Sequence, residues 1–246
     1  MSYPNKSVRH PMSNIVYWEY MIRKFQFTPD SYYHICNRSN DEHPIFLDEK
    51  DYGRLLFSIL FYQAPIPFYN IGRQTSYFVR HSMFNIPLDT FKKVAAIRKV
   101  ELNAFTIMPN HFHLLVQEKT KKGISLYLQR LQNGYAKYFN EKYKKRGHLF
   151  QGVFRAVPVK TNEQLFYLSA YIHRNPRELE KWRDKEIEYP WSSCQDFIKK
   201  NRWGELLKPM IILDQFSNAE SYYEFLKTST AKLKSNRSSA RDLFLD

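Results

Sequence analysis

The sequence HFH at residues 111–113 places two imidazole side chains two positions apart. On a β-strand, residues at this spacing project from the same face, so His111 and His113 can direct two ring nitrogens at one ion. Neutral imidazole is a common ligand of divalent metals. An HxH pair alone is more often a surface or hydrogen-bonded pair, but here the apolar residues 114–116 continue the strand. The sequence therefore predicts a metal-binding pair on a rigid element.

A second group of candidate residues lies in the segment 161–176, where Tyr171 has Tyr167 and Asn175 one helical turn away on either side. A tyrosine with an ordinary pKa of about 10 is a poor nucleophile at neutral pH. A metal ion that polarises a phosphate compensates for this weakness, and an amide oxygen from Asn175 suits the same metal. Alternatively, Tyr171 packs in the core, and Asn175, which precedes Pro176, marks the end of a helix. These residues alone leave both alternatives open.

Positive charge is concentrated in residues 119–160, where Lys and Arg far outnumber the acids. Phosphate contacts by such residues release condensed counterions, and neighbouring aromatic rings such as Phe150 and Phe154 can stack on unpaired bases. A solvated helix end is the alternative reading of this charge. The residues predicted to contact nucleic acid are Lys137, Lys142, Lys144, Lys145, Arg146, His148 and Arg155.

The composition of the whole chain agrees with a nucleic-acid partner. Its 246 residues include 38 Lys and Arg against 24 Asp and Glu, for a net charge of +14. An excess of this size attracts polyanions. No apolar run approaches the roughly 20 residues that span a bilayer, and two cysteines outside any CxxC pair exclude a disulfide framework and a zinc knuckle. A globular protein of the cytoplasm is expected, with nucleic acid favoured over a membrane surface.

Hydrophobic periodicity predicts the elements that hold these residues. Alternation predicts strands, a stripe at helical spacing predicts helices, and Thr161 is a capping candidate for the last helix. The prediction is a strand at 31–39, a helix at 48–63, a long connection at 64–90, a short helix at 91–98, two strands within 100–118, a helix at 124–143, a strand at 148–160 and a helix at 161–176. This order predicts an α+β fold with helices on one face of an antiparallel sheet.

Three strings together resemble a known family: MPNHFHLLVQ, LQRLQNGYAKYFNEKYKKRGHLFQGVFR and YLSAYIHRNP. They occur in the order found in the insertion-sequence-200-like transposases, single-tyrosine HUH enzymes, and specifically resemble the REP-associated tyrosine transposase group. The resemblance covers roughly residues 31–195. It implies an RRM-like or ferredoxin-like sheet that bears the histidines, with the tyrosine helix lying across from them.

The resemblance also implies roles for individual residues. His111 and His113 would bind Mg²⁺ or Mn²⁺, Asn175 would be a third metal ligand, and Tyr171 would attack DNA. Tyr135 is a rival nucleophile, but its place in the apolar stripe of the helix at 124–143 favours packing.

The resemblance implies a transposase that nicks and joins single-stranded or hairpin DNA through a 5′-phosphotyrosine intermediate. It is compatible with a homodimer. A domesticated protein that binds structured DNA or RNA without cleaving it is the first alternative, and a metal-dependent nuclease that uses water is the second. The predicted organisation is an N-terminal arm at 1–28, a transposase domain at 29–196 with an insertion near 64–99, and a helical extension with a basic tail at 197–246.

Overall fold

A computed structural model of the chain describes residues 26–229. Most of the predicted arm at 1–28 and the basic tail lie outside the described residues. Four strands form one antiparallel sheet in the order β2-β3-β1-β4. The strands are β1 (Tyr32–Arg38), β2 (Val100–Ile107), β3 (His111–Glu118) and β4 (Arg155–Val159). This is the strand order of the ferredoxin-like βαββαβ arrangement, so the predicted α+β class and antiparallel sheet are confirmed.

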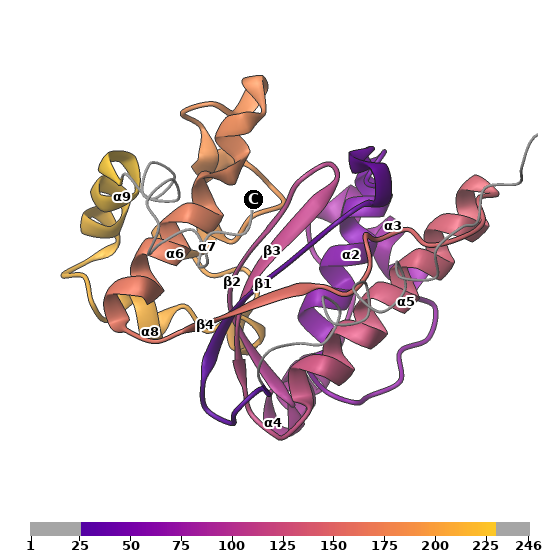
Figure 1. Ribbon diagram of the computed structural model, residues 1–246, viewed down its shortest axis with the longest axis horizontal. Helices are drawn as coiled ribbons and strands as arrows, with labels where there is room; N and C mark the ends of the chain where they lie inside the picture. The colour runs from indigo at the N-terminus through magenta and orange to yellow at the C-terminus, as the bar shows by residue number, and fades with distance from the viewer. Residues whose placement is uncertain (1–25, 230–246) are drawn as a thin grey trace, which may run out of the picture.

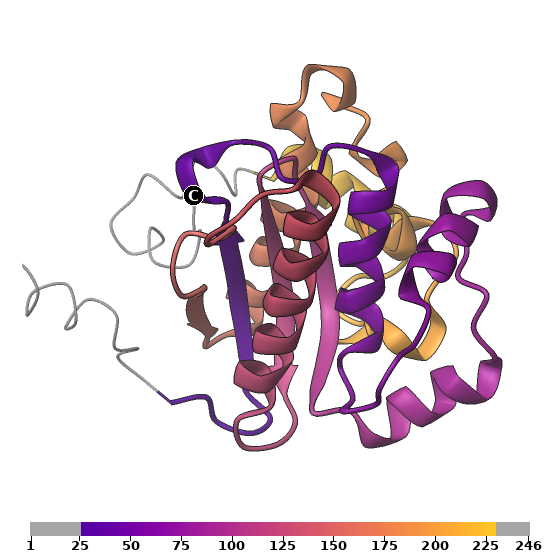
Figure 2. The ribbon, with the colours of Figure 1, turned by 90° about the vertical axis from the view of Figure 1, so that its right-hand side faces the viewer.

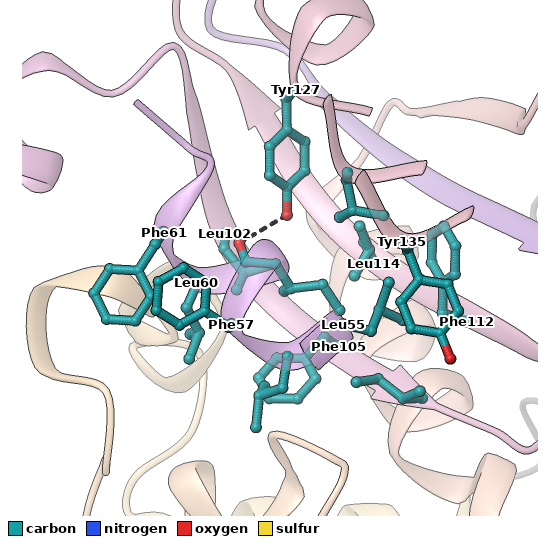
Figure 3. Close-up of a cluster of buried hydrophobic side chains, with 14 of the residues drawn as sticks. Leu55, Phe57, Leu60, Phe61, Leu102, Phe105, Phe112, Leu114, Tyr127 and Tyr135 are labelled. Atoms are coloured by element: carbon teal, nitrogen blue, oxygen red, sulfur yellow. Dashed lines mark hydrogen bonds between the residues drawn. The ribbon is translucent and has the colours of Figure 1, made fainter. Parts of the chain in front are cut away.

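Two helices, α2 (Glu49–Phe61) and α5 (Gly123–Tyr143), cover one face of the sheet (Figures 1 and 2). The acidic start of α2 forms a capping box in which Asp48 and Asp51 each accept from the other's backbone N–H. The Tyr127 hydroxyl, near the start of α5, joins the two helices by donating to the Ile59 carbonyl, near the end of α2, at 2.8 Å (Figure 3). Their apolar stripes meet the side chains of the sheet in the larger core, so the helical periodicity at these two segments predicted their buried faces correctly.

The prolines of segment 64–90 predict a connection without secondary structure, but the segment is partly helical. It contains α3 (Ile71–His81) and the start of α4 (Leu88–Ile97). The prolines flank these helices instead of interrupting them, and Pro87 is the N-cap of α4. In α3, the buried side chains of Ile71, Thr75 and Phe78 repeat at helical spacing and face the larger core.

A second helical layer covers the other face of the sheet (Figure 1). It consists of α6 (Asn162–Arg174), α7 (Cys194–Ile198), α8 (Met210–Leu213) and α9 (Ala219–Thr228). Leu165, Leu168 and Ile172 of α6 pack with Leu115 of the sheet in a separate core, which Tyr222 of α9 completes. The structure therefore has helices on both faces, whereas the sequence pattern predicted one covered face. Short 3₁₀ turns complete the chain: η1 (Asn40–Glu42), η2 (Asn175–Glu178), η3 (Glu180–Trp182), η4 (Glu186–Glu188) and η5 (Gly204–Leu206).

Two strands depart locally from the predicted pattern. A β-bulge lies between Leu102 and Ala104, so Leu102 shares the core of Phe105 while Ala104 faces the α6 layer. The predicted strand at 148–160 pairs with β1 only from Arg155 onward. Gly152 in the preceding loop has a φ of 61°, a left-handed conformation that ends regular pairing.

The start of α5 gives a stability prediction. Lys122, its N-cap residue, makes no side-chain capping bond. The buried Glu118 carboxylate replaces it, accepting from the backbone N–H groups of Gly123 at 3.0 Å and Ile124 at 2.6 Å. Glu118→Ala should therefore lower the free energy of unfolding by about 1–3 kcal/mol, as measured by urea denaturation. The exposed Glu141→Ala on the same helix is the control, and an equal loss in both variants would contradict the capping role.

Candidate active site

His111 and His113 lie on β3 and share one face of the strand, as its alternation predicted, and this face meets the α6 layer. Both side chains are buried, and their rings meet edge to face with centroids 5.0 Å apart. Phe112, between them, points the other way into the larger core. The buried apolar neighbours hold the backbone of β3 in place, so the two imidazoles are presented on a rigid strand.

Neighbouring polar groups orient both rings. Nδ1 of His111 lies 2.7 Å from the side-chain oxygen of Asn110. Because that oxygen only accepts hydrogen bonds, Nδ1 carries the proton and Nε2 carries the lone pair of the neutral ring. Nδ1 of His113 lies 2.9 Å from Nε2 of His34 on β1, and Nε2 of His113 lies 4.0 Å from the Cys36 sulfur. Such partners on the far ring nitrogen are typical of histidines that bind metals.

Tyr171 lies directly against this pair. Its ring meets the His113 ring edge to face at 5.4 Å and the His34 ring at 5.7 Å. The side chain is fully buried. The helix that carries it starts at Thr161, whose side chain accepts from the Gln164 backbone N–H, as predicted from the sequence. Helix α6 therefore brings a phenol from a distant part of the chain to the two imidazoles.

Asn175 follows Tyr171 by one turn at the end of α6 and is buried. Its amide nitrogen donates to the Tyr171 carbonyl at 2.9 Å. Its side-chain oxygen is buried, and within residues 26–229 no hydrogen-bond donor reaches it. An orphaned buried oxygen of this kind costs free energy unless a ligand or water satisfies it.

The donors around Tyr171 fit a divalent ion. No cluster of three or more His, Cys, Asp or Glu side chains suited to a metal occurs among the described residues. An ion here would therefore combine the imidazoles of His111 and His113 with neutral oxygens, for which Asn175 is the available side chain. Mg²⁺ commonly keeps several waters and binds through few protein ligands together with substrate phosphates. The residues present are thus compatible with the predicted Mg²⁺ or Mn²⁺.

His173 lies on α6 between Tyr171 and Asn175 but has a structural role. Its Nδ1 lies 2.7 Å from the Tyr222 hydroxyl and its Nε2 lies 2.8 Å from the Ser193 hydroxyl. Burial lowers the pKa of His173 to about 3. The neutral ring therefore ties α6 to α9 and to the segment before α7.

Acid should destabilise the protein through this residue. Because the pKa of His173 is about 6.5 when unfolded and about 3 when folded, only the unfolded chain gains its proton between these values. Stability should fall by about 1.4 kcal/mol per pH unit below pH 6.5 from this group alone. Urea denaturation at pH 7 and pH 4.5 measures the loss, which His173→Gln should reduce and the exposed His81→Gln should not. Equal acid sensitivity in all three proteins would contradict the assignment.

The sequence analysis missed His34 and Cys36, which lie on β1 beside His113. The signal was present in the alternation of residues 31–39, which puts positions 34, 36 and 38 on one face of the strand. The apolar face of the same strand, with Tyr33, Ile35 and Asn37, is the opposite one. Only the pairing of β1 with β3 shows that the polar face of β1 meets the histidines.

The basic residues predicted to contact nucleic acid are not gathered around Tyr171. Five of them, Lys137, Lys144, Lys145, Arg146 and His148, are exposed at the end of α5 and in the loop after it. Helix α5 covers the opposite face of the sheet from α6 (Figure 1). Arg155 is the exception, because it starts β4 and pairs with Cys36 on β1.

Lys142 forms ion pairs within the protein. Its ammonium lies 2.7 Å from a carboxylate oxygen of Asp48 and 2.6 Å from one of the buried Asp51. These partners raise its pKa above the ordinary value. Lys142 thus neutralises an acidic pair at the start of α2 and joins that helix to α5.

Tyr135, the rival nucleophile, is a core residue. Its hydroxyl donates to the Ile45 carbonyl at 2.6 Å, and burial raises its pKa well above the ordinary value. It packs in the larger core, on the face of the sheet opposite Tyr171. The packing role inferred from the apolar stripe of α5 is therefore confirmed.

The segment that carries the site is similar to a known protein family. Residues 73–175 match the family model described as "Transposase IS200 like". This segment is therefore similar to the IS200-like transposases. The match runs from α3 to Asn175 and includes both histidines and Tyr171, so the resemblance drawn from the three motifs is confirmed.

The chain is also similar to a solved structure. The chain is similar to a REP-associated tyrosine transposase bound to a REP hairpin, at 14% sequence identity and a TM-score of 0.47. The likeness covers 75% of this chain and 88% of that chain. No curated protein matches the sequence. None of the helices within residues 26–229 is long and apolar enough to cross a membrane.

Proposed function

We propose that this protein is a transposase that cleaves and rejoins single-stranded or hairpin DNA, with Tyr171 as nucleophile. The observation that carries the proposal is the edge contact at 5.4 Å between the Tyr171 ring and the ring of His113, a member of the HxH pair. The match of residues 73–175 to the IS200-like transposase family supports a DNA transposition reaction. A likeness to a hairpin-bound protein and a net charge of +14 agree with a DNA substrate.

The Tyr171 oxygen would attack the phosphorus of a DNA phosphodiester. The new bond joins the phenol oxygen to phosphorus, and the bond from phosphorus to the 3′-oxygen of the preceding nucleotide breaks. The proton lost by the phenol is balanced by the proton gained by the released 3′-hydroxyl. The product is a 5′-phosphotyrosine that conserves the energy of the phosphodiester, so a 3′-hydroxyl of another strand can reverse the step.

The other residues of the site position the reacting groups. His111 and His113, with the Asn175 oxygen, would hold a Mg²⁺ or Mn²⁺ ion, which supplies a Lewis acid for the phosphate when bound. His34 and Asn110 fix the orientation of the two imidazoles through their Nδ1 atoms. Because Tyr171 is fully buried, the chain that covers its hydroxyl has to move before a phosphate reaches it.

A denaturing gel tests the proposal. The protein would be mixed with a library of single-stranded DNA hairpins with randomised flanks, labelled at the 5′ or the 3′ end, with and without Mg²⁺ or Mn²⁺. A metal-dependent band of protein-linked DNA that carries only the 3′ label is expected, because Tyr171 retains the 5′-phosphate. Cleavage without a protein-linked band would instead indicate a nuclease that uses water. Tight, salt-sensitive binding without cleavage of any hairpin would indicate a binding protein.

A further inference from the structure

A small pocket opens on the sheet immediately beside the two histidines. Its volume is about 150 Å³, and its walls are formed by Cys36, Asn37, Arg38, Glu42, Gln151 and Arg155. This is smaller than the roughly 300–1,000 Å³ of pockets that take whole small molecules. The pocket therefore suits a compact group such as one phosphate with part of its sugar.

Strand pairing places the pocket next to the histidines. Arg38 of β1 is directly opposite His111 of β3, and Cys36 is directly opposite His113. On its other side, Cys36 is opposite Arg155 of β4. Residues paired across antiparallel strands have Cβ atoms about 4.5–5.5 Å apart on the same face. Arg38 is thus the immediate neighbour of His111, and Arg155 lies one strand further from the histidines, beyond Cys36.

The chemistry of the lining favours an anion. Two Arg side chains line the pocket with one acid, Glu42, whose carboxylate lies 3.4 Å from Arg38. The Glu42 side chain is 70% exposed, so this ion pair is a weak one that a phosphate can displace. Arginine forms paired, charge-assisted hydrogen bonds with phosphate oxygens.

Asn37 also lines the pocket, but its position on β1 alternates with those of Cys36 and Arg38. Its side-chain oxygen accepts from the Arg38 backbone N–H at 2.9 Å, which fixes the orientation of the amide. The amide nitrogen of this buried side chain has no hydrogen-bond acceptor within the described part of the chain. A buried donor without an acceptor is costly, but strand alternation directs the Asn37 side chain to the other face of the sheet, so Arg38 and Arg155 are the proposed phosphate contacts.

We propose that Arg38 and Arg155 bind the DNA phosphate that neighbours the cleaved one. The inference deepens the proposed function and rests on it for the identity of the strand. The pocket would hold the backbone on one side of the scissile bond, so that the cleaved phosphate lies at Tyr171. Such positioning of a substrate accelerates a reaction without chemical participation.

Binding measurements test the pocket separately from cleavage. All proteins would carry Tyr171→Phe, and each would be titrated with a fluorescent oligo-dT strand at several salt concentrations. Arg38→Gln and Arg155→Gln should each weaken binding by roughly tenfold and lower the slope of log K against log salt by about 0.7. Arg73→Gln is the matched control, because it removes the same charge from an exposed site on α3, on the opposite face of the sheet.

A backbone substitution locates the phosphate. In the hairpin that the protein cleaves, one phosphate at a time would be replaced by an uncharged methylphosphonate. At the phosphate next to the cleavage point, the methylphosphonate should weaken DNA binding by the protein that carries Tyr171→Phe alone. It should not further weaken DNA binding by the protein that also carries Arg38→Gln, because the contact is already lost. The proposal would be overturned if the effects of the methylphosphonate and of Arg38→Gln on DNA binding added fully at every position. It would also be overturned if the Arg38→Gln and Arg155→Gln variants bound DNA as Arg73→Gln does. If no hairpin is cleaved, the proposed function fails, while the oligo-dT slopes still decide the pocket.

Discussion

Tyr171→Phe should abolish the protein-linked DNA product, with a loss of at least about 1,000-fold in its rate of formation. The substitution removes the only oxygen of the side chain and keeps the ring that contacts His113 and His34. Binding of single-stranded DNA should stay within about twofold of the wild-type value, because the DNA contacts that we propose come from other residues. A denaturing gel and a fluorescence titration measure the two quantities.

Two tyrosines give matched controls for this prediction. Tyr167 lies one turn earlier on α6, where its ring packs beside Phe166 and Phe225 of the α6–α9 layer. Tyr135 lies in the core on the opposite face of the sheet. Tyr167→Phe and Tyr135→Phe should both retain the covalent product. A product that survives Tyr171→Phe but disappears in Tyr167→Phe would move the nucleophile to the neighbouring turn.

The second large effect concerns the metal. His111→Ala and His113→Ala should each weaken binding of Mn²⁺ by more than about 100-fold, because each removes one nitrogen donor from a site with few protein ligands. Isothermal titration with Mn²⁺ measures the affinity without requiring DNA cleavage. Chelation with EDTA should stop cleavage by the wild-type protein, and added Mn²⁺ should restore it.

His81→Ala is the control for the metal measurement, since this exposed histidine lies on α3, away from the sheet face that carries the site. Its affinity for Mn²⁺ should equal that of the wild-type protein. Unchanged affinity in both His111→Ala and His113→Ala would show that the HxH pair does not hold the ion. Cleavage that continues in EDTA would show that the reaction does not require one.

Local patterns predicted the elements that bear the site but not their contacts. The alternation of residues 111–117 predicted which side chains of β3 share a face, and Thr161 was predicted as the cap of α6. The contact between Tyr171 and His113 joins two segments distant in the sequence. Periodicity carries no information about such a contact, so the sequence predicts it only through the family resemblance.

Three features escaped the sequence analysis for identifiable physical reasons. Helix α3 was hidden because prolines at its flanks resemble loop residues, although its stripe of Ile71, Thr75 and Phe78 is regular. The second helical layer was missed because it buries the face of the sheet that carries the polar histidines. The β-bulge near Leu102 was missed because one extra residue looks like ordinary alternation until the partner strand is known.

Peptide mapping of the covalent product tests the central claim most directly. The wild-type protein would react with its hairpin in the presence of Mn²⁺, and the product would be digested with nuclease and trypsin for tandem mass spectrometry. We predict a nucleotide linked by its 5′-phosphate to Tyr171. A nucleotide on Tyr167 or on any other residue, or cleaved DNA without a modified peptide, would contradict the assignment of Tyr171 as the nucleophile.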